Sequence, residues 1–465
     1  MRRLLSILVP LSCILVAACS SASPATSRPT PPTPSGVSSG ASTSSSTNRA
    51  SAFTPWWTYH RTTSRSGHTG SPPGTLAPAW TKNLGQAVYG EPLVVGSSLI
   101  AATEGNRVVS MNPRSGHIRW STSLGTPQPP STLPCGDIQP LGITGTPAYD
   151  AGTGSVFVVA ETKGGHHTLW ALNATTGKRR WHRSLDVVKH RNRRAEQQRA
   201  AVLVADGRVL VSFGALAGDC KNYVGYITST STAGTGRIHH YAVPTQRGGG
   251  MWSPAGPVLG RNGHVYVVSA NGAAAGSGWD RSNSVFEMDP KTLHVFSAFA
   301  PNTWRHDSLD DQGLGSTSPV SIPSLHRLVV GTKRSRIYLL REHFHGVGSA
   351  VKRIDGCSTF GGPAVAGRMV IEPCLDEGQM RALHVGSKSL SWRWQVDSLY
   401  GSPIIAGKRV YVSDRDSGDL VVLRLSDGHQ LQRIHAGDLT HFPSEVVDGG
   451  YVFVPTLTGI TAFQG

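Results

Sequence analysis

The sequence predicts an all-β fold assembled from repeated four-stranded units. Charged residues make up only 15% of the 465-residue chain, and glycine and proline are abundant, with 54 and 30 copies. No long stretch places apolar residues at helical spacing, whereas short β-branched and aromatic runs recur between turn-forming residues. The chain is also too long for one ordinary compact core, which favours several domains or an array of repeats.

A small or polar residue, a proline and an apolar run mark the start of each unit. Six copies contain the proline, and two further copies have another residue in its place. Proline is tolerated at the first residue of a strand. Successive units start 40 to 62 residues apart, which suits four strands with loops of variable length. The equivalent positions are Pro92, Pro147, Ala201, Pro257, Pro319, Pro363, Pro403 and Ser444.

Eight units predict an eight-bladed β-propeller, with seven or nine blades as alternatives because the third unit is degenerate. The last unit ends after a third strand, near Ala462, and has no fourth. The segment Trp80-x-x-x-Leu84 precedes the first full unit and has the form of the fourth strands that begin at Trp120 and Trp181. We therefore expect this N-terminal strand to pair near Ala462 and close the last blade, because closure removes exposed sheet edges.

Two junctions between third and fourth strands carry the most specific motif. Its Asn can hydrogen-bond to the turn backbone, its Gly permits positive φ, and its Trp can pack between blades. Trp80, Trp120 and Trp181 are therefore expected to dock neighbouring blades. The two full copies are Ser110-x-Asn112-x-x-Ser115-Gly116-x-x-x-Trp120 and Ala171-x-Asn173-x-x-Thr176-Gly177-x-x-x-Trp181. Weaker copies are Thr235-Gly236 and the segment from Ala382 to Trp392.

The first 51 residues predict export and attachment to a membrane. Residues 1–18 have two arginines and then a short apolar stretch, as signal peptides do. The order Val16-Ala17-Ala18-Cys19 resembles a bacterial lipobox, in which Cys19 is lipidated; ordinary cleavage after Ala18 is the alternative. Residues 19–51 are rich in Ser, Thr and Pro and predict a disordered tether. Residues 52–465 then form the propeller, held outside the cytoplasm by a lipid anchor in the cell membrane.

The chain carries a formal charge of +16, or +14 once Arg2 and Arg3 are removed with the signal. Nucleic acid is not an expected partner of an exported protein. Anionic lipid headgroups or acidic polymers are expected instead, and compositional drift toward arginine is the alternative explanation. The basic loop from Lys189 to Arg194 fits docking of this kind or a plain solvated loop.

Four cysteines remain beyond Cys13 and Cys19, and they predict two disulfides with three possible connectivities. Cys357 and Cys374 flank a turn at Ala366-Gly367. Facing positions of an antiparallel hairpin sum to a constant, so these two cysteines should lie opposite each other. Elimination then pairs Cys135 with Cys220.

The tryptophan motif resembles the docking motif of pyrroloquinoline-quinone-type propellers. Over about residues 55–465 the chain is similar to actinobacterial lipoproteins with such repeats, and more distantly to the propeller lipoprotein of the outer-membrane assembly machinery, a binding scaffold. The resemblance implies an architecture and does not specify a reaction. Segments that carry it are Trp57-x-Tyr59-His60, Cys135-Gly-Asp-Ile138, Gly142-Ile-Thr-Gly-Thr-Pro147 and the unit of Cys357 and Cys374.

Two functions follow from this resemblance. The first is a non-catalytic scaffold that binds a protein or polymer, with no cofactor and no metal. The alternative is a quinone-dependent dehydrogenase or another redox enzyme, which would use pyrroloquinoline quinone with calcium in its axial funnel. The related enzymes also need a carboxylate and an amide around calcium and a general-base Asp. These residues cannot be aligned here, and no adjacent cysteines occur, so the scaffold is favoured.

Residues at the starts of the inner strands, and in the loops before them, should surround one mouth of the axial funnel. Asp310 and Asp311 are the most suggestive pair, since two acids near a channel could hold a cation, although a solvated loop or turn cap is the favoured interpretation. The funnel candidates are Tyr89, Arg199, Trp252, Asp310, Asp311, Phe360, Tyr400 and His441.

Overall fold

The structure is a computed structural model, and it describes residues 52–189 and 191–465. The expected signal peptide, the lipidation at Cys19 and the tether therefore lie outside the described residues. The described residues form one compact unit. Within the described ranges, no helix is long and apolar enough to cross a bilayer.

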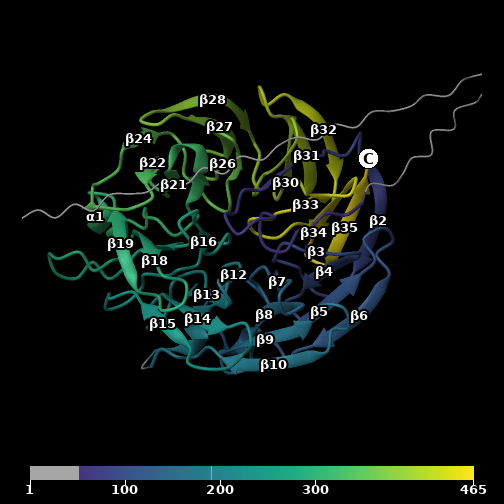
Figure 1. The fold of residues 1–465 in the computed structure, drawn as a ribbon, viewed down its shortest axis with the longest axis horizontal. Coiled ribbons are helices and arrows are strands. Elements are labelled where there is room, and N and C mark those ends of the chain that lie inside the picture. Colours follow the sequence, from purple (N-terminus) through teal and green to yellow (C-terminus); the bar gives the residue numbers. More distant parts are fainter. Residues whose placement is uncertain (1–51, 190) are drawn as a thin grey trace, which may run out of the picture. The chain divides into compact units, whose positions relative to one another are not determined.

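Eight antiparallel sheets form a ring (Figure 1), so the predicted eight-bladed β-propeller is confirmed. Each blade has four main strands, and the first strand of each blade lies nearest the axis. We number the blades from the N-terminal side of the ring. The turns between first and second strands and between third and fourth strands share one face, which we call the turn face. The remaining loops form the opposite face, which we call the loop face.

The first four blades span residues 93–300. Blade one contains β3 (Leu93–Val95), β4 (Ser98–Ala102), β5 (Arg107–Met111) and β6 (Ile118–Ser123). Blade two contains β7 (Ala148–Asp150), β8 (Ser155–Thr162), β9 (His166–Asn173) and β10 (Arg179–Ser184). Blade three contains β12 (Leu203–Ala205), β13 (Arg208–Ala215), β14 (Tyr226–Ser231) and β15 (His239–Ala242). Blade four contains β16 (Val258–Leu259), β17 (Val265–Ser269), β18 (Ser284–Met288) and β19 (Val295–Ala300).

The other four blades complete the ring. Blade five contains β20 (Val320–Ile322), β21 (Arg327–Gly331), β22 (Arg336–Arg341) and β24 (Lys352–Asp355). Blade six contains β25 (Ala364–Ala366), β26 (Met369–Cys374), β27 (Gln379–Val385) and β28 (Leu390–Asp397). Blade seven contains β29 (Ile404–Ala406), β30 (Arg409–Asp414), β31 (Asp419–Arg424) and β32 (Gln430–His435). Blade eight contains β33 (Val446–Asp448), β34 (Tyr451–Pro455), β35 (Gly459–Gln464) and β2 (Ala77–Asn83).

A few short elements lie outside this pattern. The helical segments are η1 (Pro130–Thr132), η2 (Arg193–Ala195), α1 (Trp304–Leu309) and η3 (Pro323–Leu325). The extra strands are β1 (His68–Thr69), β11 (Glu196–Gln197) and β23 (Gly346–Val347). Of these, β1 pairs in parallel with the inner strand β29, so it lies inside the ring.

The N-terminal strand closes the last blade, as the sequence predicts. β2 pairs antiparallel with β35, and Trp80 lies opposite Ala462 in this register. Figure 1 shows the two chain ends meeting here, with purple β2 beside yellow β35. The outer edge of blade eight is thereby supplied by the start of the propeller chain, which fastens the ring.

The predicted docking tryptophans follow one geometry. The indole of each donates a hydrogen bond to a carbonyl in the third-to-fourth turn of the next blade, and its ring covers a glycine of that turn. Trp120 donates to the Ala174 carbonyl at 3.2 Å and covers Gly177. Trp80 and Trp181 do the same with Pro113 and Thr232. The motif therefore joins blades eight, one and two each to the blade that follows.

Two weaker copies of the motif are assigned to the wrong residues by the sequence. Trp394, and not Trp392, lies opposite Ala382 and docks on blade seven, where it donates to the Leu425 carbonyl at 2.9 Å. The turn of blade six is two residues longer than the motif requires. In blade three the glycine under Trp181 is Gly234, and no heavy atom lies within 4 Å of the position that a Cβ on Gly236 would take.

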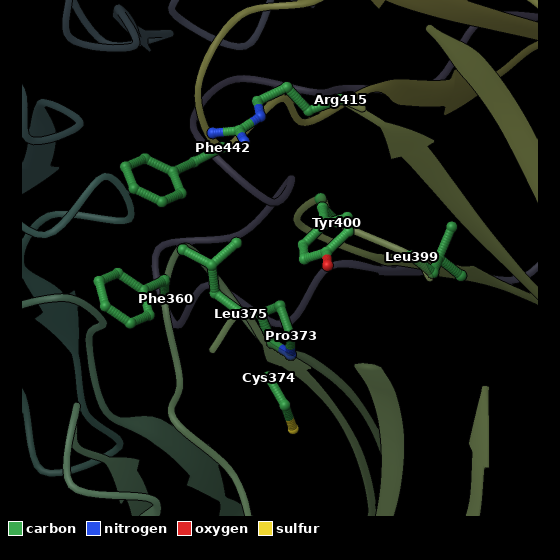
Figure 2. A pocket seen from close by; sticks show the side chains of 9 residues that line it. Phe360, Pro373, Cys374, Leu375, Leu399, Tyr400, Arg415 and Phe442 are labelled. Atoms are coloured by element: carbon green, nitrogen blue, oxygen red, sulfur yellow. The ribbon is translucent and has the colours of Figure 1, made fainter. Parts of the chain in front are cut away.

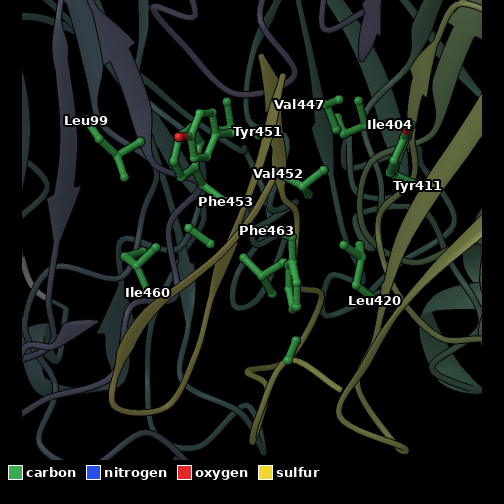
Figure 3. Packing of buried hydrophobic residues seen from close by; sticks show 14 of the residues in the cluster. Leu99, Ile404, Tyr411, Leu420, Val447, Tyr451, Val452, Phe453, Ile460 and Phe463 are labelled. Carbon is green, nitrogen blue, oxygen red and sulfur yellow. The ribbon is translucent and has the colours of Figure 1, made fainter. Parts of the chain in front are cut away.

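The core lies between the blades. Its largest cluster joins blades seven, eight and one, and Figure 3 shows Tyr451, Phe453 and Phe463 of blade eight packed between Leu99 and Tyr411 of its neighbours. These side chains alternate along their strands, because each blade presents one face to each neighbour.

The four cysteines form two disulfides with the predicted connectivity, but Cys357 and Cys374 do not lie opposite each other in the predicted hairpin. The register of β25 and β26 pairs Ala364 with Ile371, and Cys374 lies opposite Thr359 in an isolated bridge before β25. Cys357–Cys374 fastens the start of blade six to the end of its second strand. Cys135–Cys220 joins the loop that enters blade two to the loop between β13 and β14. Such bonds persist in oxidising compartments, so these pairs indicate an extracytoplasmic location.

Candidate functional site: the axial channel and its mouth

A segment that the sequence analysis did not assign occupies the axial channel. Residues 53–70, here called the strap, run once around the inside of the ring and touch the inner edges of blades eight, one, two, three, four, six and seven in that order. Figure 1 shows this purple segment near the centre of the ring. The hydrogen-bonded pairs are Thr54–Asp448, Trp56–Val94, Trp57–Tyr149, Thr58–Val202, Thr63–Leu259, Ser66–Val365 and Gly67–Ile405.

The strap enters and leaves the channel at the turn face. Thr54 hydrogen-bonds to Asp448 at the end of β33, and Thr69 accepts from Gly407 in the turn after β29. Between these points Trp56, His60 and Arg65 have no more than 1% of their surface exposed. The chain itself therefore fills the channel at this end.

Arg65 fastens the strap to blades three and four. Its guanidinium donates to the carbonyls of Val202 and Pro257 at 3.1 Å each, and also to Thr58 Oγ1 and the Tyr59 carbonyl. Burial lowers its pKa to about 10, although the nearby Glu91 carboxyl opposes this change. The group stays a cation at neutral pH, and its charge is held by backbone dipoles.

Glu91 fastens the strap to blades one and eight. Its carboxyl accepts from the Trp56 indole, from the His60 amide at 2.9 Å and from Ser444 Oγ at 2.6 Å. Burial raises its pKa to about 8, against the lowering effect of these donors. Burial favours the protonated form of Glu91, because a neutral carboxyl carries no charge that must be removed from water.

The same burial predicts a pH-dependent stability, most simply at Glu372 on β26. Burial raises the pKa of Glu372 to about 8, and its one hydrogen-bond donor is Thr359 Oγ1 at 3.4 Å. A carboxyl with a raised folded pKa contributes stability that is complete below pH 4.5 and is lost as pH rises through 8. Glu372→Gln, which cannot ionise, should remove up to about 3 kcal/mol of the decline in unfolding free energy between pH 5.5 and 8.5. Urea unfolding at several pH values measures this, and an unchanged profile would contradict it.

The opposite end of the channel, on the loop face, opens into a pocket of about 470 Å³. Four of the funnel candidates line it: Arg199, Trp252, Asp311 and His441. Tyr89 belongs to an adjoining pocket that shares His441 and Asp137. Five of the eight funnel candidates therefore lie at one mouth of the channel.

Arg199 is held flat at this mouth. Its guanidinium lies over the rings of Tyr89 and Phe442, 5.3 and 5.2 Å from their centroids, and Nη2 donates to the His441 carbonyl at 2.8 Å. His441 pairs with Asp137 at 3.1 Å, and this hydrogen bond is the main reason that the pKa of Asp137 is lowered. A planar cation between two rings is rigid and presents donors in fixed directions.

Phe442, which was not among the candidates, is the centre of the aromatic wall. It stacks on Phe360 with a centroid distance of 6.1 Å and contacts Trp252 at 6.2 Å. Its backbone φ of +56° lies in the left-handed region, which residues other than glycine rarely adopt. No sequence motif marks this residue. Its neighbour His441 was identified only from its position before the last blade.

The remaining candidates lie beside the mouth. Phe360 and Tyr400 line a small side pocket of about 20 Å³ between blades six and seven, and Figure 2 shows both with Phe442 and Arg415 around it. Asp310 caps α1 and pairs with Arg334 at 2.8 Å, and it does not line the pocket. The two acids therefore pair with different bases, Asp310 with Arg334 and Asp311 with Lys333.

The alternative function would place a calcium-bound quinone at this mouth. Such a site needs a carboxylate and an amide that are free to hold the cation. Each carboxylate of the pocket is engaged, and among residues 52–189 and 191–465 no three His, Cys, Asp or Glu side chains converge as metal ligands. The engaged pairs are Asp137–His441 (3.1 Å), Asp219–Tyr223 (2.6 Å) and Asp311–Lys333 (2.6 Å).

The chain is similar to several known proteins. The family described as "Outer membrane protein assembly factor BamB" matches residues 74–283, from the closing strand into blade four. No curated protein matches the sequence. Among solved structures, the quinohemoprotein alcohol dehydrogenase of Comamonas testosteroni is 17% identical, with a TM-score of 0.69 over 88% of this chain and 80% of that one.

Two further structures have the same fold. A europium-containing methanol dehydrogenase is 15% identical, with a TM-score of 0.69 over 88% of this chain and 98% of that one. BamB from Moraxella catarrhalis is 18% identical, with a TM-score of 0.59 over 84% of this chain and 100% of that one. At such identities the likeness establishes the fold and leaves the activity open. The docking motifs and the eight closed blades establish an eight-bladed β-propeller, and the matches show that residues 74–283 are similar to propeller repeats of the pyrroloquinoline-quinone type.

Proposed function

We propose that this protein is a membrane-tethered, extracytoplasmic binding protein that holds a segment of a partner protein in the pocket on its loop face. The observation that carries the proposal is the Arg199 guanidinium fixed between Tyr89 and Phe442 at the mouth of that pocket. Arginine and aromatic side chains are the residue types that dominate binding energy at protein interfaces. The tether and the lipid on Cys19 remain expectations from the sequence.

The shape of the channel supports a bound segment. The strap occupies the channel toward the turn face, whereas the pocket opens on the loop face, so the proposed ligand enters from the loop face. Lys333 adds a second cation there, 5.9 Å from the centroids of Trp252 and Phe360. A pocket of about 470 Å³ accommodates a few side chains of an extended segment.

A site-specific cross-link tests this proposal. A photoreactive residue at the exposed Ala217, in the pocket wall, should give one discrete adduct when the full chain is expressed in its exporting host. Arg199→Gln should weaken the adduct at least about tenfold, because it removes the cation between the rings. Arg305→Gln is the matched control, since Arg305 is exposed on the same face outside the pocket.

Two results would contradict the proposal. The first is an adduct that persists in Arg199→Gln, because the pocket would then not be the binding site. The second is a bound chromophore after incubation with pyrroloquinoline quinone and calcium, together with dye reduction by an alcohol or sugar. That result would establish the redox alternative.

A further inference from the structure

The two faces of the ring differ sharply in charge. We count each turn or loop together with the strand residue on either side of it. On the turn face, 15 Lys and Arg accompany 6 Asp and Glu. On the loop face, counted in the same way, 15 Lys and Arg accompany 19 Asp and Glu. The two faces therefore carry equal numbers of bases and differ in their acids, which gives the turn face a net charge of +9 (15 − 6) and the loop face a net charge of −4 (15 − 19).

Burial does not remove this difference. Six acids of the loop face and one of the turn face are buried, and leaving them out gives 15 bases to 13 acids against 15 to 5. Twelve of the fifteen bases on the turn face are exposed, among them Lys178, Arg368 and Lys388. They come from seven of the eight blades, so the charge covers the face broadly.

The chain also enters the propeller at the turn face. Phe53 packs against Tyr451 at 5.9 Å, and a Cβ on Gly449, in the turn of blade eight, would strike its ring. Thr54 hydrogen-bonds to Asp448 in the same turn. Any anchor that precedes residue 52 is therefore connected to the ring through its basic face.

We infer that the turn face docks on an anionic bilayer surface, so that the pocket on the loop face points away from the membrane. This inference rests on the proposed function in one respect only, because the membrane tether proposed there would join the ring at the turn face. Each Lys or Arg close to an anionic surface contributes about 1 kcal/mol, and the attraction extends about one Debye length. An excess of basic residues spread over a whole face orients the ring, whereas an isolated cluster would not.

The strap fits the same orientation. It seals the channel at the turn face, so no opening to the channel is lost when that face rests on headgroups. The pocket stays accessible to a partner in the surrounding compartment. The basic loop that includes Arg191, Arg193 and Arg194 lies on the loop face, and it is the competing site for an anionic surface.

Hydrogen–deuterium exchange of the full chain with vesicles tests the orientation. Vesicles of phosphatidylcholine with phosphatidylglycerol should slow exchange in the turns of the turn face, and vesicles of phosphatidylcholine alone should not. A triple variant, Lys178→Glu, Arg368→Glu and Lys388→Glu, should lose most of this protection, as should high salt. The matched variant Lys163→Glu, Lys221→Glu and Arg305→Glu makes the same charge change on the loop face, and the turn face of this variant should stay protected from exchange.

Three outcomes would overturn the inference. Protection centred on the loop of residues 185–202 would place the membrane on the opposite face. No difference between the two vesicle compositions would remove the electrostatic basis. If soluble polyphosphate, added together with vesicles of phosphatidylcholine alone, slowed exchange in these turns equally, the turn face would be assigned to an anionic polymer. None of these results affects the cross-link at Ala217, so a failure here is distinguishable from a failure of the proposed binding function.

Discussion

Arg65→Met is expected to lower the free energy of unfolding by roughly 3–5 kcal/mol. The substitution keeps an unbranched stem but is shorter, and it removes the guanidinium donors to the Val202 and Pro257 carbonyls inside the channel. The Val202 carbonyl still accepts from Thr58 Oγ1 at 3.3 Å, whereas the Pro257 carbonyl loses its side-chain donor. Buried carbonyls without a donor carry their full desolvation penalty. Urea unfolding, followed by tryptophan fluorescence, measures the change.

Arg61→Met is the matched control for this prediction. Arg61 belongs to the same strap, but it is partly exposed and its guanidinium donates to the His68 carbonyl at 3.1 Å. We expect this variant to lose less than about 1 kcal/mol, because water can replace that bond. Equal effects of the two substitutions would show that the strap is held by its backbone pairing and not by the buried guanidinium.

Gly177→Ala is expected to destabilise the protein by roughly 2–4 kcal/mol. Gly177 has φ +69°, and a Cβ there would lie well inside van der Waals contact with the Trp120 ring. The substitution therefore adds two costs, a strained backbone and a displaced docking tryptophan.

Gly207→Ala separates these two costs. Gly207 has φ +70°, and no heavy atom lies within 4 Å of the Cβ position, so only the backbone cost of about 1 kcal/mol applies. Thermal and urea unfolding of both variants give the difference. In a Trp120→Ala background, Gly177→Ala should lose most of its excess cost over Gly207→Ala, because of these close contacts only the one with Thr122 Oγ1, at 2.8 Å, remains. A full additional loss in that background would refute the docking explanation.

Much of the fold is readable from the sequence because it depends on local chemistry. The proline-led strand starts give the blade spacing, and the unmatched strand near Ala462 predicts the seam with Trp80. The Asn, Gly and Trp of the docking motif act within one turn and one neighbour, so spacing alone identifies Trp120 and Trp181. Where a turn has a different length, as before Trp394, the fixed spacing fails.

The candidate site was only partly predictable, for a physical reason. Position before an inner strand correctly brings Arg199, Trp252 and His441 to one mouth, because that rule follows from the ring itself. Phe442 and Lys333 complete the mouth without any motif, since their contacts join blades far apart in the sequence. The dense aromatic residues of 53–60 were a signal for the strap, but they do not form a strand pattern.

The sequence by itself determined the class of fold, the number of blades, the seam and the pairing of the cysteines. The fold class, the blade number and the seam depend on periodicity and turn chemistry, which can be read along the chain. The cysteine pairing came from an expected hairpin and from elimination, and it is right although the hairpin register is not the expected one. Only the tertiary structure decided that the chain fills its own channel, that one end stays open and that the acidic residues gather on the loop face, which leaves the face where the chain enters with a net positive charge. These features depend on which turns the closed ring brings to the same side, and no local pattern contains that information.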